Sequence, residues 1–177
     1  MAIGNRVKEC IDKFNLDDLE NALIQLSIAF DGTAKKEYPK TVKVGERFKT
    51  FLRDNQDIIT YFAFSGNMFI DCKFNGYTIE EIIYEVLRCG LLHEGSIPNE
   101  IEFINEILLG RNNGRWRFPK TYVQGGLLAV IGAESNKNEN IPTHYTTVIN
   151  GKVYKVNDLW GRRDRIREIM MKDISEL

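Results

Sequence analysis

The stretch YEVLRCGLLHEG, residues 84–95, combines residue types that could cleave a phosphodiester bond. Arg88 carries a permanent positive charge, and histidine, here His93, titrates near neutral pH without any perturbation. Together they could stabilise charge on a phosphate and transfer a proton without a metal. The ordinary alternative is a solvated Arg88 that pairs with Glu85, and a His93 stabilised by the negative end of a helix dipole.

The spacing of Arg88 and His93 does not by itself make them a pair. Each residue of an α-helix turns by about 100°, so residues five apart point roughly 140° away from each other. Thr78 and Glu81 match a capping box, which predicts that a helix begins directly after Thr78. On that helix Arg88 lies opposite an apolar face, which consists of Ile82, Ile83, Val86, Leu87 and Leu91. Gly90 costs about 1 kcal/mol relative to alanine inside a helix, so a break there could bring His93 round.

A second candidate is the basic and aromatic stretch GRNNGRWRFPK, residues 110–120, which contains no acidic residue. Cations bind phosphates and aromatic rings stack on unpaired bases, so this composition predicts contact with RNA. The predicted RNA-binding residues are Arg111, Arg115, Trp116, Arg117 and Lys120. A solvated loop that is fixed by one buried tryptophan would show the same composition, and both interpretations stay open.

The composition limits the class of protein. With 177 residues, 43% of them hydrophobic and 11% aromatic, the chain fits a single folded domain, residues 1–177. Its three cysteines form no CxxC pair, and His93 and His144 lie far apart, so we expect no disulfide framework and no metal site. There is no Walker or GxGxxG phosphate loop, and we expect no cofactor. No apolar run approaches the roughly 20 residues of a membrane helix, so we expect no membrane contact and a cytoplasmic location.

Helices are predicted for most of residues 15–109. Apolar residues recur at steps of three and four after Asn15, a favourable N-cap, and this first helix is expected to stop at Asp31-Gly32. An extended segment or a tight turn is predicted at residues 68–77. The remaining predicted helices cover residues 44–52, 58–62, the capping-box helix, and a segment from Pro98 to Gly110 that carries Ile101, Ile104 and Leu108.

Beyond residue 110 the pattern changes. TYVQGGLLAVIG (residues 121–132) and HYTTVINGKVYKV (residues 144–156) are rich in β-forming residues, and Asn150-Gly151 predicts a hairpin turn. The segment GRRDRIREIMM is predicted to return to helix, with its arginines mainly on the helix surface. The predicted fold class is therefore α+β.

The segment LRCGLLHEG, with Arg88 and His93 in an R-x4-H arrangement at the end of an apolar helix, resembles the signature of the HEPN superfamily. ALIQLSIAFDG and VGERFKTFL also resemble the first helices of its Apea-like branch, so the likeness covers residues 16–109. It implies a HEPN-like helical bundle over those residues, followed by a small β-rich extension over residues 110–177. It further implies a homodimer that acts as a metal-independent ribonuclease, in defence or stress, with Arg88 and His93 of both copies in one catalytic cleft.

One position departs from the pattern of the superfamily. Active members often carry asparagine or another polar residue after the arginine, whereas this chain has Cys89. The resemblance therefore leaves a second function open, a non-catalytic module of the same fold that binds a protein partner.

Overall fold

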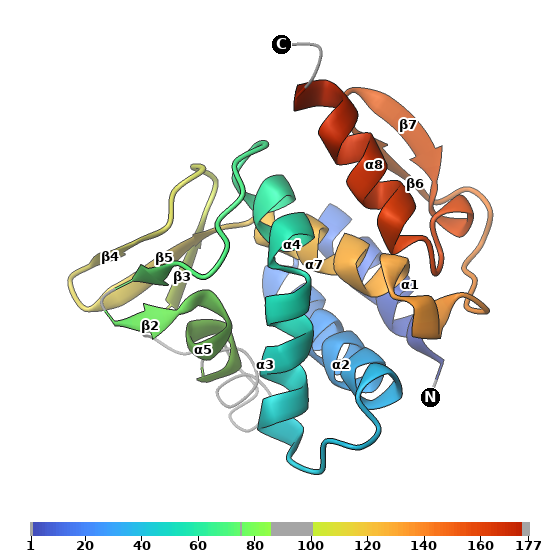
Figure 1. Ribbon diagram of the computed structural model, residues 1–177. Coiled ribbons are helices and arrows are strands. Elements are labelled where there is room, and N and C mark those ends of the chain that lie inside the picture. Colours follow the sequence, from blue (N-terminus) through green and yellow to red (C-terminus); the bar gives the residue numbers. More distant parts are fainter. Residues whose placement is uncertain (1, 75, 86–100, 175–177) are drawn as a thin grey trace.

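The computed structural model describes residues 2–74, 76–85 and 101–174, and shows a mixed α+β protein in which a group of helices is flanked by small sheets (Figure 1). The helices are α1 (Ile3–Asn15), α2 (Leu19–Glu37), α3 (Val44–Asp54), α4 (Gln56–Ala63), α5 (Ile79–Ile83), α7 (Tyr122–Gly132) and α8 (Arg163–Ile174), with 3₁₀ turns η2 (Glu134–Asn136) and η3 (Val156–Asp158). The strands are β1 (Lys73–Phe74), β2 (Tyr77–Thr78), β3 (Ile101–Ile104), β4 (Gly110–Asn112), β5 (Arg115–Pro119), β6 (Thr146–Ile149) and β7 (Lys152–Lys155).

Helix α7 lies at the centre of the core. It packs against α1, α2, α4 and α8, and all of its residues except Gln124 are buried. The sequence analysis predicted β structure for residues 121–132, and this prediction was wrong. A helix that is apolar on every side shows no 3.6-residue period, so its sequence cannot be distinguished from a buried strand by periodicity.

The predicted helix from Pro98 to Gly110 is also contradicted within its described part. Residues Ile101–Ile104 form strand β3, which pairs in parallel with β5, and Gly110 begins strand β4. The strand order is β3-β5-β4. Spacing of apolar residues at 101, 104 and 108 fits a helix, but the partner strand β5 supplies hydrogen bonds that only the tertiary structure brings within reach.

The helix boundaries near residue 16 differ from those predicted. Asn15 ends α1 rather than capping the next helix, and Leu16 is 75% exposed. The carboxylate of Asp18 instead caps α2 by accepting a hydrogen bond from the Asn21 backbone amide. Helix α2 then continues through Gly32, where it was predicted to stop, and ends at Glu37.

Several local predictions are confirmed. The capping box of α5 forms as predicted, with Thr78 and Glu81 each accepting a hydrogen bond from the backbone amide of the other. Asn150 and Gly151, with φ of 51° and 71°, join β6 and β7 as a tight hairpin. Helices α3, α4 and α8 lie where the sequence pattern predicted helices.

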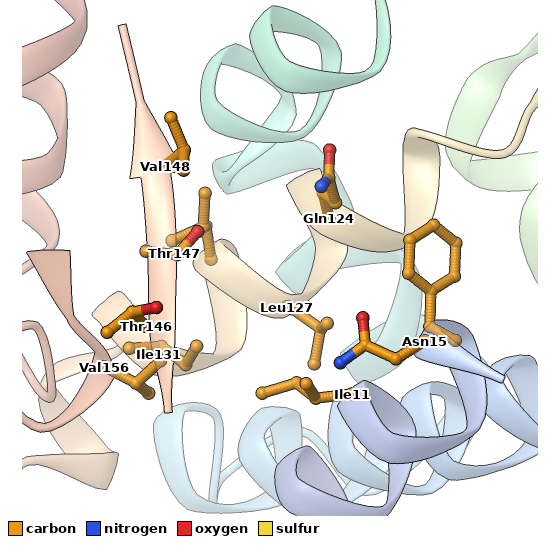
Figure 2. A pocket seen from close by; sticks show the side chains of 11 residues that line it. Ile11, Asn15, Gln124, Leu127, Ile131, Thr146, Thr147, Val148 and Val156 are labelled. Carbon is orange, nitrogen blue, oxygen red and sulfur yellow. The ribbon is translucent and has the colours of Figure 1, made fainter. Parts of the chain in front are cut away.

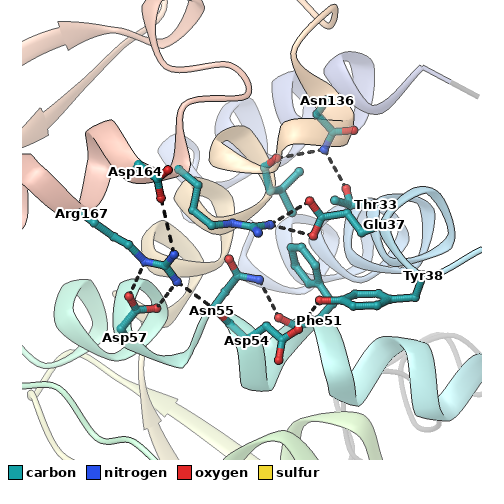
Figure 3. Close-up of polar contacts among 12 residues, drawn as sticks. Thr33, Glu37, Tyr38, Phe51, Asp54, Asn55, Asp57, Asn136, Asp164 and Arg167 are labelled. Carbon is teal, nitrogen blue, oxygen red and sulfur yellow. Dashed lines mark hydrogen bonds and ion pairs between the residues drawn. The ribbon is translucent and has the colours of Figure 1, made fainter.

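Ion pairs attach α8 to the rest of the fold (Figure 3). The Arg163 guanidinium lies 2.7 Å from a carboxylate oxygen of Glu37 on α2, and the Arg167 Nε lies 2.6 Å from Asp57 on α4. Arg165 pairs with Glu168 one helical turn away, at the helix surface. Two of these arginines therefore hold the last helix in place rather than lying only on its surface.

Among the described residues, no helix is both long and apolar enough to cross a bilayer.

Gly125 permits the close approach of α7 to α4. A Cβ added there would lie 2.9 Å from the Ile59 Cα, against backbone that cannot rotate away. We expect Gly125→Ala to lower the free energy of unfolding by about 1–3 kcal/mol, despite the better helix propensity of alanine. Gly126→Ala is the matched control, because its Cβ would meet the side chains of Phe30 and Leu26, which can adjust. Urea unfolding measures both, and an equal or larger loss in Gly126→Ala would contradict this explanation.

Candidate functional site

Arg88, Cys89 and His93 lie outside the described residues, so the structure does not place the predicted catalytic pair. It does describe the chain on both sides. Directly before the segment, the Tyr84 ring packs on Phe48 of α3 at 5.7 Å between centroids. Directly after it, Ile101 begins β3 opposite Trp116 of β5. The motif is therefore connected at one end to α3 and at the other to the sheet that carries the basic stretch.

The predicted RNA-binding stretch forms the β4–β5 hairpin and the residues that follow it. Trp116 is only 7% exposed and belongs to the core, so its indole is not a free surface for a base in this conformation. The Arg111 guanidinium lies 5.5 Å from the centre of the Trp116 ring and donates a hydrogen bond to the Gly114 carbonyl. Within the hairpin, an exposed arginine thus lies over a buried tryptophan of the neighbouring strand.

The other predicted cations also have partners within the protein. The Arg115 guanidinium donates to the Ile101 carbonyl at 3.4 Å, and Arg117 lies 3.3 Å from a carboxylate oxygen of Glu102 on the neighbouring strand. Lys120 pairs with Asp17 at 2.9 Å. The Asp17 side chain is 82% exposed, and ion pairs this exposed contribute little because water competes for both charges.

A pocket of about 230 Å³ lies between α1, α7 and β6 (Figure 2). Its floor consists of buried aliphatic side chains, Leu127, Leu128, Ile131 and Val156. Its walls include the half-buried side chains of Ile11 and Phe14. Its rim is formed by Asn15, Gln124, Thr146, Thr147 and Val148. No lining residue carries a charge.

The two carboxamides on the rim come from different helices, Asn15 at the end of α1 and Gln124 in the first turn of α7. In the described part of the chain neither side chain has a hydrogen-bond partner, although each can both donate and accept. Figure 2 shows Leu127 between the side chains of Gln124 and Ile11, with the Asn15 amide group beside it. The pocket therefore offers unpaired amide groups above an apolar floor.

A cluster of titratable groups adjoins this pocket along α1 and just before β6. Asp12 accepts hydrogen bonds from Lys8 and from the Tyr145 hydroxyl, and these bonds hold the pKa of its carboxyl below the usual range. The bond to Asp12 correspondingly raises the pKa of Tyr145. The His144 ring stacks on Tyr145 at 4.4 Å. The Tyr145–Asp12 hydrogen bond joins the loop before β6 to α1, and α1 and β6 both line the pocket.

The sequence analysis did not identify this pocket. Gln124, Leu127, Leu128 and Ile131 occur at helical spacing, and that spacing was a usable signal. It was missed because residues 121–132 were interpreted as strands. The contributions of α1 and β6 carried no signal, since α1 lies more than a hundred residues before the other two segments and β6 has no helical spacing.

Comparison with known proteins places this chain among proteins whose names assign no activity. It is 28% identical over 193 residues to "Uncharacterized protein Rv1289" of Mycobacterium tuberculosis and to "Uncharacterized protein Mb1320" of Mycobacterium bovis. Each alignment covers the whole of this chain and 91% of the relative. No solved structure matches the chain. The Rv1289 family matches residues 2–176, and the chain therefore belongs to the Rv1289 family.

Proposed function

We propose that this protein binds RNA and cleaves it without a metal, with Arg88 and His93 as the catalytic pair. The proposal starts from the R-x4-H motif and its resemblance to HEPN ribonucleases. It rests on one observation about the described residues. Arg115 contacts the first residue of β3, the strand that directly follows the segment carrying the motif. A strand of RNA held by the β4–β5 hairpin would thus be close to the point where that segment rejoins the fold.

The chemistry assigned to the pair is an intramolecular transesterification of the RNA backbone. The 2′-hydroxyl attacks the adjacent phosphorus, the bond to the 5′-oxygen breaks, and a 2′,3′-cyclic phosphate and a free 5′-hydroxyl result. His93 would take the proton from the 2′-hydroxyl or give one to the leaving oxygen. Arg88 would stabilise the negative charge on the phosphorane-like transition state.

The basic hairpin supplies the binding part of the proposal. Arg111 is exposed, and its contacts within the described residues are to the Gly114 carbonyl and the Trp116 ring rather than to a carboxylate. Its charge can therefore add a phosphate contact without giving up an ion pair within those residues. Arg115 is also exposed and donates a hydrogen bond to the Ile101 carbonyl. Arg117 and Lys120 would have to exchange a carboxylate partner for the phosphate.

Salt dependence of RNA binding tests this assignment. We expect the double variant Arg111→Gln and Arg115→Gln to bind a single-stranded RNA more weakly. Its plot of log affinity against log salt should be flatter by about 0.7 per lost phosphate contact. The matched control removes the same charge at the start of α8 with Arg162→Gln, directly before the helix, and Arg165→Gln within it, both exposed and remote in sequence. Fluorescence anisotropy at several salt concentrations measures both variants, and an equal effect in the control would remove the hairpin from the proposal.

A non-catalytic assembly module is the second candidate, and one observation favours it. Val148 and Val153 are directly opposite each other on β6 and β7, with exposures of 61% and 68%. A cross-strand pair of exposed valines is a small apolar surface suited to another protein. Light scattering measures whether the protein is a homodimer and whether Val148→Lys disrupts it. A homodimer that this substitution disrupts, together with an absence of RNA cleavage, would favour the assembly function.

A further inference from the structure

We propose that the pocket between α1, α7 and β6 binds an adenine base, presented on a nucleotide whose phosphate contacts Lys120. Free adenosine monophosphate and an unstacked adenosine within bound RNA offer the same chemistry to this site. The inference deepens the proposed function, because it names the part of an RNA that the protein would recognise. The pocket itself does not depend on the catalytic role of Arg88 and His93.

The lining of the pocket favours a neutral ligand with flat apolar faces. Burying a charge without a partner is costly, and none of the lining residues could pair with one. Leu127 and Ile131 offer an aliphatic floor, while Phe14 and Ile11 form a wall against which a heterocycle can pack. A nucleobase is neutral, planar and apolar on both faces, and satisfies all three conditions.

The rim provides polar groups that can pair with the edge of adenine. A carboxamide can donate one hydrogen bond and accept another, which matches the N7 acceptor and the N6 amino donor of adenine. Asn15 and Gln124 each supply such a group, and the hydroxyls of Thr146 and Thr147 supply further donors and acceptors nearby. Enzymes and binding proteins that extrude a base read its edge through similar contacts.

The size of the cavity limits the ligand to one base. Its volume of about 230 Å³ lies below the roughly 300–1,000 Å³ that is usual for pockets that enclose a drug-sized molecule. One fused ring system fits such a space, whereas a dinucleotide does not. The sugar and phosphate would therefore extend out of the opening.

Lys120 is the cation that we assign to that phosphate. It lies four residues before Gln124, at the start of α7, and its partner Asp17 lies two residues after Asn15. The ion pair thus joins the two chain segments that hold the amide groups. Because the Asp17 side chain is 82% exposed, it can be hydrated when a phosphate takes its place beside the lysine.

Calorimetry on the full chain with adenosine monophosphate, adenosine, cytidine monophosphate and inorganic phosphate tests the proposal. We expect adenosine monophosphate to bind more tightly than cytidine monophosphate, and the double variant Asn15→Ala and Gln124→Ala to lose about tenfold or more in affinity for it. Lys120→Gln should weaken the binding of adenosine monophosphate while leaving the affinity for adenosine unchanged. Asn112→Ala and Lys152→Gln, which change exposed residues of the same kinds on β4 and β7, should alter nothing.

The outcomes separate this inference from the proposed function. One outcome is that adenosine monophosphate binds to the wild type and not to the double variant while no RNA is cleaved or bound. That result supports the base site and contradicts the ribonuclease proposal. Should RNA bind through the hairpin while the wild-type protein takes up none of the nucleotides, the pocket is not a base site. Equal binding of adenosine and cytidine monophosphates, or binding that the double variant retains, also overturns it. Circular dichroism confirms that the double variant, which changes two exposed side chains, remains folded.

Discussion

Glu80→Ala is expected to lower the free energy of unfolding by about 2–4 kcal/mol, from the unpaired polar group and the cavity that it leaves. The Glu80 side chain is only 3% exposed, and its carboxylate accepts hydrogen bonds from Arg53 Nε at 3.1 Å and from Gln56 Nε2 at 2.6 Å. Without it, Gln56 keeps a buried amide group with no acceptor. Arg53 is half exposed and can turn to water, so it adds little to the loss.

The Glu80 carboxylate also joins three parts of the fold that lead to the candidate site. Arg53 belongs to α3, Gln56 to α4 and Glu80 to α5, the helix that precedes the segment with Arg88 and His93. The Gln56 side-chain oxygen accepts a hydrogen bond from the backbone amide of Asp71, and this bond fixes the chain before β1. This contact network therefore holds α5 against α3 and α4.

The adjacent residue provides a matched control. Glu81 has its carboxylate in the capping box, near the surface, so Glu81→Ala should cost only about 0.5–2 kcal/mol. Glu80→Gln should fall between the two, because one amide oxygen still accepts from Gln56 while its amino group faces Arg53. Urea unfolding followed by circular dichroism gives all three values. A loss in Glu80→Ala no greater than that in Glu81→Ala would show that the buried contacts contribute little.

His93→Ala is expected to slow RNA cleavage by about 100- to 10,000-fold, the usual contribution of a positioned acid or base. The assay uses single-stranded RNA with EDTA present, since the proposed chemistry needs no metal. Arg88→Ala should also reduce the rate, through lost stabilisation of the transition state rather than through proton transfer. A wild-type rate in folded His93→Ala protein would exclude His93 from catalysis.

Mixing the two inactive variants tests whether the site is shared between copies. If Arg88 and His93 of two protomers meet in one cleft, a mixed dimer of Arg88→Ala and His93→Ala chains contains one intact pair and regains part of the activity. A site complete within one chain would regain none. The pH profile of the wild type should show the titration of the histidine, and this feature should be absent from any residual activity of His93→Ala.

The sequence by itself determined those parts of the fold that depend on neighbouring residues. Thr78 and Glu81 form the predicted capping box, because each side chain needs only an amide three residues away. Asn150 and Gly151 form the predicted turn, because both tolerate a positive φ. The amphipathic helix α3 was predicted from its apolar face, and the α+β class followed from these local patterns.

The tertiary structure alone decided the elements and the site whose partners lie far away in the chain. Residues 122–132 are helical because α7 is enclosed by other helices, and such burial removes the polar face that would have shown its period. Residues 101–104 form a strand because β5 lies beside them. The pocket exists only where residues 11–15, 124–131 and 146–156 come together, since α1, which supplies one amide group and one wall, lies more than a hundred residues before α7 and β6 in the sequence.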